Sequence, residues 1–196
     1  LKKIIKANFN LVKVSSGLLS NIPLINEIAK CKKPIIISTG MSKELDIDYT
    51  VSKLKKNEFY ILKCTSIYPA NDIDLNLNSI NYLSKKYNVI CGFSDHTQDA
   101  LASIAAASKG ARIIEKHFKM SKFDKCPDEK ISMDPENFKK MCYQIRRVEK
   151  MLGNKNFQST KKELKLREKN YRYIFSAKDL YPGDTLNLKN INFKRS

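Results

Sequence analysis

A repeating alternation of short apolar runs and longer helix-period segments is the feature that most constrains the fold of this chain. Five runs rich in β-branched or apolar residues each precede a polar turn and a helical pattern. They are Leu11 to Ser15, Pro34 to Ser38, Phe59 to Cys64, Val89 to Phe93 and Arg112 to Lys116. Their starts lie roughly 23 to 30 residues apart, the length of one strand, one helix and two loops. This spacing predicts an α/β fold with a parallel sheet, either a β/α barrel or a doubly wound sheet.

The segments between the predicted strands carry helix signals. Ile22 to Lys30 has Pro23 near its first turn, and Leu101 to Lys109 is Ala-rich and is closed by a glycine. A strong amphipathic pattern from about Pro135 to Leu152 ends at Gly153. We expect the helices between strands to lie on the outside of the sheet, and the long helix to close the first domain.

The chain divides into three predicted parts. Residues 1–153 form the β/α domain, and residues 154–169 are polar and highly charged, as in a linker or a surface helix. Residues 170–196 contain β-rich runs and a Pro-Gly-Asp turn at 182–184, which indicate the truncated start of a small β-rich domain. With 196 residues the chain is shorter than the roughly 250 of a complete eight-stranded barrel, and it does not begin with Met. We therefore expect it to start within a domain.

The composition indicates which binding partners and which cellular location to expect. The net charge is +17, but the lysines are spread along the chain rather than clustered with arginine or aromatic residues, so we expect no nucleic-acid partner. The positive electrostatic potential of such a chain attracts acidic or phosphorylated small substrates. No apolar run reaches the ~20 residues of a membrane span. The five cysteines form no CxxC pair, which favours reduced thiols and a cytoplasmic protein.

The only two histidines, His96 and His117, follow consecutive predicted strands by three positions and by one. Neighbouring strands lie ~4.8 Å apart, and in parallel barrels the active site lies at the carboxyl ends of the strands. Both imidazoles can therefore share one divalent cation, and two imidazoles with substrate and water oxygens suit Mn²⁺, Fe²⁺, Co²⁺ or Zn²⁺. The alternative is that each histidine is a hydrogen-bonded core residue.

Hydroxyl groups lie at the ends of four of the predicted strands. Ser and Thr beside free loop amides bind a phosphate or a carboxylate without adding charge. The strand ends carry Ser15, Ser16, Ser38, Thr39, Thr65, Ser66, Tyr68 and Ser94. Lys13 lies in the first predicted strand and adds a positive charge, although a surface position or a helix-capping role also accounts for such residues.

Six short motifs, in order, resemble the sialic acid synthases. They are Lys13-Val-Ser-Ser-Gly17, Ser38-Thr-Gly-Met41, Cys64-Thr-Ser-Ile-Tyr-Pro69, Gly92-Phe-Ser-Asp-His-Thr97, Glu115-Lys-His-Phe118 and Cys126-Pro-Asp128. The resemblance runs from about residue 9 to the end of the chain. It implies a partial TIM (β/α)8 barrel with the last five strands, followed by the start of an antifreeze-like (SAF) domain.

The resemblance implies a transferase reaction in which phosphoenolpyruvate condenses with an N-acyl hexosamine, such as N-acetylmannosamine, to a nonulosonic acid and phosphate. It implies Mn²⁺ or Mg²⁺ on His96 and His117, which would be both metal ligands and catalytic residues. Phosphoenolpyruvate would be bound by Lys13, Ser16, Ser38, Ser66, Tyr68 and Ser94, and the sugar by Asp128 and by Arg195. Arg195 would act across a homodimer, in which the antifreeze-like domain reaches the partner's barrel.

Three departures from the family pattern lie on the sugar side of the site. Leu18 stands where the family usually has Glu, Cys126 where it has Gly, and Glu129 where it often has His. The resemblance covers five of the eight strands, so the first three are absent. We therefore expect the isolated chain to be poorly stable and inactive, because an open sheet exposes its edge strands. A non-catalytic fragment or a binding or pairing module that keeps the fold is the alternative reading.

Overall fold

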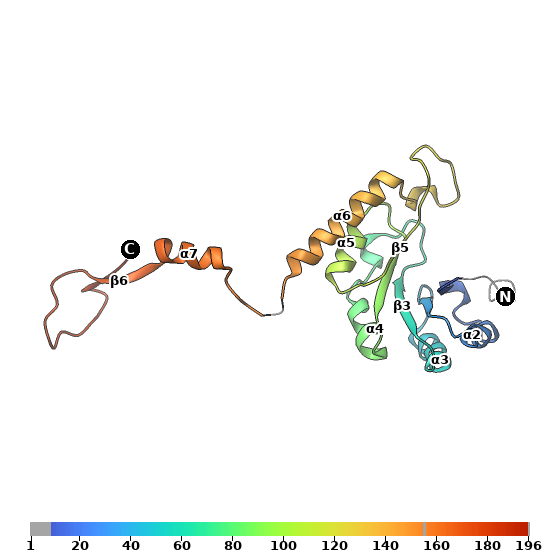
Figure 1. Ribbon diagram of the computed structural model, residues 1–196, viewed down its shortest axis with the longest axis horizontal. Coiled ribbons are helices and arrows are strands. Elements are labelled where there is room, and N and C mark those ends of the chain that lie inside the picture. The colour runs from blue at the N-terminus through green and yellow to red at the C-terminus, as the bar shows by residue number, and fades with distance from the viewer. Residues whose placement is uncertain (1–8, 155, 196) are drawn as a thin grey trace. The chain divides into compact units, whose positions relative to one another are not determined.

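The computed structural model describes residues 9–154 and 156–195 (Figure 1). The chain forms two compact units, one ending at Gly153 and the other starting at Asn154. The first unit contains a five-stranded sheet and its helices. The second contains one helix and a β-hairpin. No helix in the described ranges is both long and apolar enough to cross a membrane.

The sheet of the first unit is entirely parallel, and its strands lie in the order in which they occur in the chain. These strands are β1 (Val12–Val14), β2 (Ile35–Ser38), β3 (Phe59–Cys64), β4 (Cys91–Asp95) and β5 (Ile114–Lys116). Each crossover between neighbouring strands contains a helix, so every strand places its carboxyl end at the same edge. This edge carries the candidate site.

The sheet is curled, as in half of a barrel. In a flat sheet the two outer strands β1 and β5, four strand spacings apart, would be about 19 Å from each other. Yet Lys13 Nζ on β1 lies 3.0 Å from Glu115 Oε1 on β5. The curvature therefore brings the two outer strands to opposite sides of one concave face. The doubly wound alternative is excluded, and the partial-barrel prediction is confirmed.

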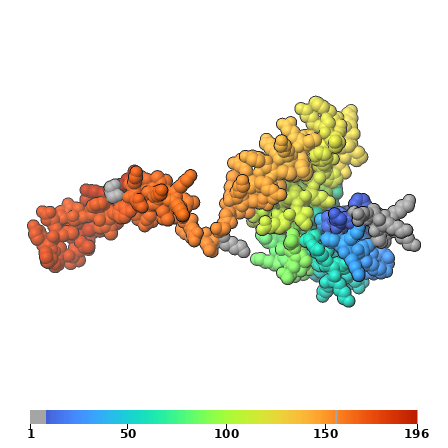
Figure 2. Space-filling model, viewed as in Figure 1, coloured from blue at the N-terminus to red at the C-terminus, as the bar shows by residue number. Residues whose placement is uncertain are grey.

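Helices cover the convex face of the sheet. They are α2 (Ile22–Ala29), α3 (Glu44–Leu54), α4 (Ser79–Tyr87), α5 (Leu101–Ser108) and α6 (Pro135–Leu152), with short 3-10 turns at Ser16–Leu18, Asp72–Asp74 and Glu129–Ile131. The Asn21 side chain accepts a hydrogen bond from Leu24 N and caps α2, and Asp134 caps α6 in the same way. Figure 2 shows α6 on the surface of the first unit.

The core lies between the sheet and the helices. All four residues of β2 are buried, as expected for an inner parallel strand. Ile35, Ile37, Ile61, Phe93 and Leu54 have no exposed surface. Burying one such side chain contributes about 1.5–3 kcal/mol, so this layer fixes the strand ends relative to one another.

The predicted strand at Val89 to Phe93 is wrong by two residues, since β4 is Cys91–Asp95. Val89 lies just beyond α4, where its N–H donates to Ser84 O next to the left-handed C-cap residue Asn88. An apolar residue directly after a helix therefore resembled the start of a strand. The shift places His96 directly after β4.

The second unit begins with a polar segment and a helix. The helix α7 (Lys161–Asn170) starts at a capping box formed by Thr160 and Glu163. The strands β6 (Arg172–Ser176) and β7 (Ile191–Arg195) then pair antiparallel. Every residue of β6 is exposed.

Candidate active site

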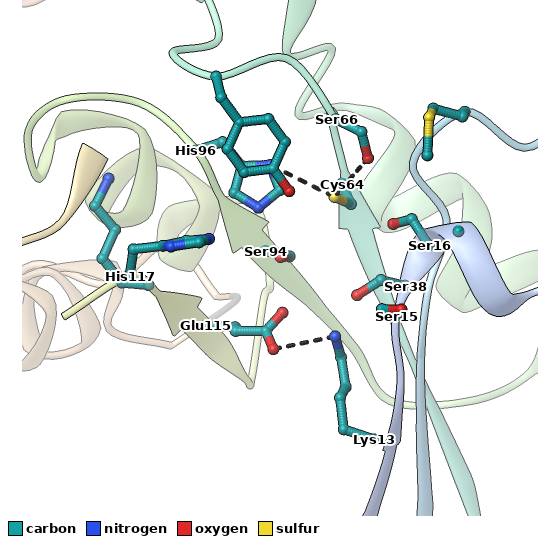
Figure 3. A pocket seen from close by; sticks show the side chains of 14 residues that line it. Lys13, Ser15, Ser16, Ser38, Cys64, Ser66, Ser94, His96, Glu115 and His117 are labelled. Atoms are coloured by element: carbon teal, nitrogen blue, oxygen red, sulfur yellow. Dashed lines mark hydrogen bonds and ion pairs between the residues drawn. The ribbon is translucent and has the colours of Figure 1, made fainter. Parts of the chain in front are cut away.

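A cavity of about 550 Å³ opens at the carboxyl ends of the five strands (Figure 3). Every strand contributes to its wall, because the residues that end parallel strands emerge at one edge of the sheet. The lining includes Lys13, Ser15, Ser16, Ser38, Met41, Cys64, Ser66, Tyr68, Ser94, His96, Glu115 and His117. Lys13 lies on β1, the hydroxyls lie on or just after β1 to β4, and the imidazoles follow β4 and β5.

Most of the predicted site residues are brought together in this cavity. The predicted residues in its lining are Lys13, Ser16, Ser38, Ser66, Tyr68, Ser94, His96 and His117. Asp128 is not part of the lining, but its Oδ2 lies 3.7 Å from His117 Nδ1. Arg195 is exposed at the end of β7 in the second unit. The roles assigned to all these residues stay predictions.

The serine side of the cavity has the chemistry of an anion site. Ser38 Oγ is buried and has no hydrogen-bond partner in the described part of the chain. An unsatisfied buried hydroxyl costs about 1–3 kcal/mol, so it fits a ligand that supplies an oxygen acceptor. Gly40 N donates to Ser16 Oγ at 2.9 Å, which turns this second hydroxyl toward the same wall.

Gly40 leaves room for the hydroxyl cluster. A Cβ atom at this position would lie 2.0 Å from Ser66 Oγ, 2.8 Å from Ser16 Oγ and 3.1 Å from Cys64 Sγ. Real Cβ atoms essentially never come within 3.0 Å of another atom, so the two serine hydroxyls would have to move. The three polar side chains converge here because residue 40 has no side chain.

Lys13 and Glu115 face each other across the cavity mouth. Their 3.0 Å ion pair joins partly exposed side chains, so it is weak and readily exchanged. An anionic ligand can take the place of the carboxylate beside Lys13. The ion pair with Glu115 therefore keeps the Lys13 ammonium group at the cavity, where it remains available to an anionic ligand.

The imidazoles of His96 and His117 lie close together, and both line the cavity (Figure 3). Their ring centroids are 5.3 Å apart at an interplanar angle of 70°. His96 Nδ1 lies 2.7 Å from the Thr65 carbonyl oxygen, which can only accept, so Nδ1 carries the proton. The lone pair is then on Nε2, the arrangement that a metal-binding histidine requires.

Tyr68 covers the imidazole of His96. The two rings stack with centroids 4.1 Å apart at 27°, and the Tyr68 ring meets His117 edge-on at 5.8 Å. These contacts restrict both imidazoles. Burial raises the pKa of the Tyr68 hydroxyl, so it stays a neutral hydrogen-bonding group.

The pKa values of the two histidines shift in opposite directions. Burial acts to lower the pKa of His96, but hydrogen bonds with Cys64 and the Thr65 carbonyl outweigh it and raise the value. Burial, followed by the nearby His96, lowers the pKa of His117. His117 therefore takes up a proton less readily, and the pair resists double protonation.

The residues fit a divalent cation held by two protein ligands. No group of three or more His, Cys, Asp or Glu side chains with ligand geometry occurs in residues 9–154 and 156–195. Two imidazoles leave the remaining coordination positions to substrate oxygens and water, as in metal sites that act on a bound substrate. Such a mixed nitrogen and oxygen set is compatible with Mn²⁺.

Cys64 is a cavity residue that the sequence reasoning did not select. Burial acts to raise the pKa of its thiol, but hydrogen bonds from His96, Ser16 and Ser66 lower the pKa to about 7. The signal was available, because Cys64 is the last residue of β3 and strand ends line the site.

Known proteins resemble the chain over most of its length. The NeuB family matches residues 1–157. N,N'-diacetyllegionaminic acid synthase from Campylobacter jejuni is 35% identical over 188 residues, which cover 93% of this chain and 56% of the relative. Pseudaminic acid synthase from the same species is 36% identical, with 93% of this chain and 54% of the relative covered.

A solved structure agrees with the fold. The crystal structure of N-acetylneuraminic acid (sialic acid) synthetase from Leptospira borgpetersenii, in complex with citrate, matches with a TM-score of 0.77 and 32% identity. The match covers 85% of this chain and 59% of that chain. This chain thus spans little more than half the length of the relatives it matches. On the family match and the shared half-barrel, the chain belongs to the NeuB family, which includes synthases of sialic, legionaminic and pseudaminic acids.

Proposed function

We propose that the chain carries part of the active site of a transferase that condenses phosphoenolpyruvate with an N-acyl hexosamine, giving a nonulosonic acid and phosphate. One observation supports the proposal above the others: a single cavity joins an anion subsite, with the unsatisfied Ser38 hydroxyl, to a pair of imidazoles. The names of the relatives agree with this class of product. The acceptor is N-acetylmannosamine or a related hexosamine.

Each side of the cavity has a separate task in this reaction. Lys13 and the serine hydroxyls hold the phosphate and carboxylate of phosphoenolpyruvate and direct its C3 toward the acceptor aldehyde. His96 and His117 hold Mn²⁺ or Mg²⁺, which when bound polarises that aldehyde as a Lewis acid. After water adds at C2, Lys13 and the serines receive the departing phosphate.

Other chain segments complete the proposal. Asp128 contacts the sugar, and its carboxylate lies near His117, which supports this role. Residues 170–196 begin an antifreeze-like domain, and Arg195 reaches the N-acyl group of a sugar bound by the partner in a homodimer. We propose a cytoplasmic location, supported by the free thiols of all five cysteines, which lie in the described ranges.

The full-length protein tests the reaction. With phosphoenolpyruvate, Mn²⁺ and N-acetylmannosamine, or the hexosamine acceptors of legionaminic and pseudaminic synthases, we expect phosphate release and a nine-carbon keto acid detected by mass spectrometry. Lys13→Ala should lower kcat/KM for phosphoenolpyruvate by about 10²-fold or more. Lys53→Ala, at a surface position, is the control and should change little.

A binding or pairing module is the second candidate. It is favoured by the limited coverage of the relatives and by Leu18, which replaces a carboxylate on the sugar side. No phosphate release above background with any of the acceptors would overturn the enzymatic proposal and support this one.

A further inference from the structure

A buried polar cluster lies on the helix side of the sheet, behind the two histidines. Asp95 ends β4 and Lys116 ends β5, and both side chains are fully buried. Lys116 Nζ lies 3.2 Å from Asp95 Oδ1. Ser103 on α5 donates to Asp95 Oδ2 at 2.5 Å. The cluster therefore joins two strands and the helix that covers them.

Thr97 completes the cluster. Its N–H and its hydroxyl donate to Asp95 Oδ1 at 2.8 and 2.7 Å, and its carbonyl accepts from Lys116 Nζ. Asp95 thus receives hydrogen bonds from Ser103 and Thr97 in addition to the charge of Lys116. A buried network in which the polar atoms are satisfied is rigid, because a displaced group loses hydrogen bonds that water does not replace.

Stability is a weak reason for this ion pair. Removing two charges from water is costly, and replacing a buried pair by apolar residues of similar volume is often neutral or stabilising. Burial indeed lowers the pKa of Lys116, although Asp95 opposes that effect. The position of the cluster beside the two histidines therefore explains its presence better than stability does.

The cluster fixes the backbone from which both imidazoles emerge. Asp95 and Lys116 are register partners across β4 and β5, and each directly precedes a histidine. Alternate residues of a strand face opposite sides, so these charged side chains point to the helices while His96 and His117 point to the cavity. His96 is held from both sides, since Asp95 and Thr97 belong to the cluster.

We propose that Asp95 and Lys116 are positioning residues that set the spacing of the His96–His117 pair for a shared divalent cation. This inference rests on the proposed function, in which the two histidines hold that cation. Lys116 also borders the cavity, but neither charged side chain has exposed surface, so the cluster acts on the site through the backbone that carries the imidazoles. Loss of the cluster should lower Mn²⁺ affinity, whereas an equally destabilising substitution elsewhere in the chain should not.

The test compares Mn²⁺ affinity, measured by electron paramagnetic resonance, with thermal melting of the full-length protein. The double variant Asp95→Leu/Lys116→Met removes both charges and keeps similar volumes. Because Thr97 and Ser103 lose their acceptor in this variant, we expect a lower melting temperature together with Mn²⁺ binding about 10- to 100-fold weaker. Thr50→Val is the matched control: it removes a buried hydrogen bond to Leu19 O on another element, so it should lower the melting temperature without changing Mn²⁺ affinity.

Single variants keep the inference testable if the double variant does not fold. Lys116→Arg retains the ion pair and should retain Mn²⁺ affinity, whereas Lys116→Met should lose it. Equal affinity in the wild type and in a folded variant without the pair would overturn the positioning role. Equal Mn²⁺ binding in the wild type and His96→Ala would instead overturn the metal site of the proposed function.

Discussion

At the scale of single residues, Gly40 is a sensitive position of the candidate site. The Gly40→Ala substitution places a methyl group against the hydroxyls of Ser66 and Ser16, at 2.0 and 2.8 Å before relaxation. Either the serines turn away or the strand end shifts, and both movements disrupt the anion subsite. We expect KM for phosphoenolpyruvate to rise by about 10-fold or more, since small misplacements of binding groups have large effects. Steady-state kinetics with varied phosphoenolpyruvate measures this.

Gly17 provides the comparison for Gly40. Gly17 also lines the cavity, but a Cβ atom there meets no heavy atom within 4 Å, so Gly17→Ala should raise KM less than Gly40→Ala does. Equal effects of the two substitutions would show that the crowding around residue 40 does not limit binding.

Residue identity alone predicted which side chains gather but not how they contact one another. The two histidines stand out in the sequence because the chain has no others and because each follows a predicted strand. The sequence could not reveal that the Thr65 carbonyl fixes the proton on His96, because residues 65 and 96 meet only through the pairing of β3 with β4. The same holds for the convergence of Ser16, Ser66 and Cys64 beside Gly40.

At the scale of elements, the start of α6 has a pH-dependent cap. Asp134 accepts hydrogen bonds from Asn137 and Glu136, and these bonds lower the pKa of its carboxyl. Its folded-state pKa is below the unfolded value, so its contribution is complete above about pH 4 and is lost as the pH falls through the folded value. The melting temperature of the wild type should exceed that of Asp134→Asn at about pH 6, and the difference should shrink toward about pH 2.

Asn keeps the capping oxygen and removes only the titration, which makes it a direct comparison. A difference in melting temperature that stays constant from neutral to acidic pH would contradict the assignment of this cap.

The helix α3 is anchored by one fully buried side chain. Leu54 has no exposed surface and belongs to the core, so Leu54→Ala should lower the free energy of unfolding by about 2–5 kcal/mol. Leu45 lies on the same helix but is 78% exposed, and Leu45→Ala should change stability by less than about 0.5 kcal/mol. Urea denaturation of both variants gives the two values, and similar losses would contradict the packing of α3.

Element positions were predictable where periodicity was clear, and less so at element boundaries. The helix Pro135–Leu152 agrees at both ends, because a proline and a glycine mark them. The predicted strand starts two residues before Cys91–Asp95 because Val89 is apolar, although its N–H bonds to Ser84 O in the preceding helix. Apolarity indicates burial or contact, whereas hydrogen bonding decides whether a residue belongs to a strand.

At the scale of the whole molecule, the sheet has two outer edges. Within the described residues, β1 and β5 each pair with one neighbouring strand only. Unpaired edges leave backbone groups free and favour association with other chains. A polypeptide of residues 1–196 alone should therefore melt at low temperature with poor cooperativity when followed by circular dichroism. A cooperative transition at high temperature would contradict this expectation.

Net charge should also influence the rate of substrate capture. The chain carries a formal charge of +17, and phosphoenolpyruvate is an anion, so long-range attraction should accelerate their encounter. Salt screens such attraction over about 10 Å at 0.1 M ionic strength and over shorter distances above it. Raising ionic strength from about 0.01 M to about 0.3 M should lower kcat/KM for phosphoenolpyruvate and leave kcat nearly unchanged, because bound substrate no longer depends on encounter.

KM for the neutral hexosamine, measured in the same buffers, is the internal control and should not change with salt concentration. A kcat/KM for phosphoenolpyruvate that is constant over this range would show that the charge of the chain lies too far from the cavity entrance to steer the substrate.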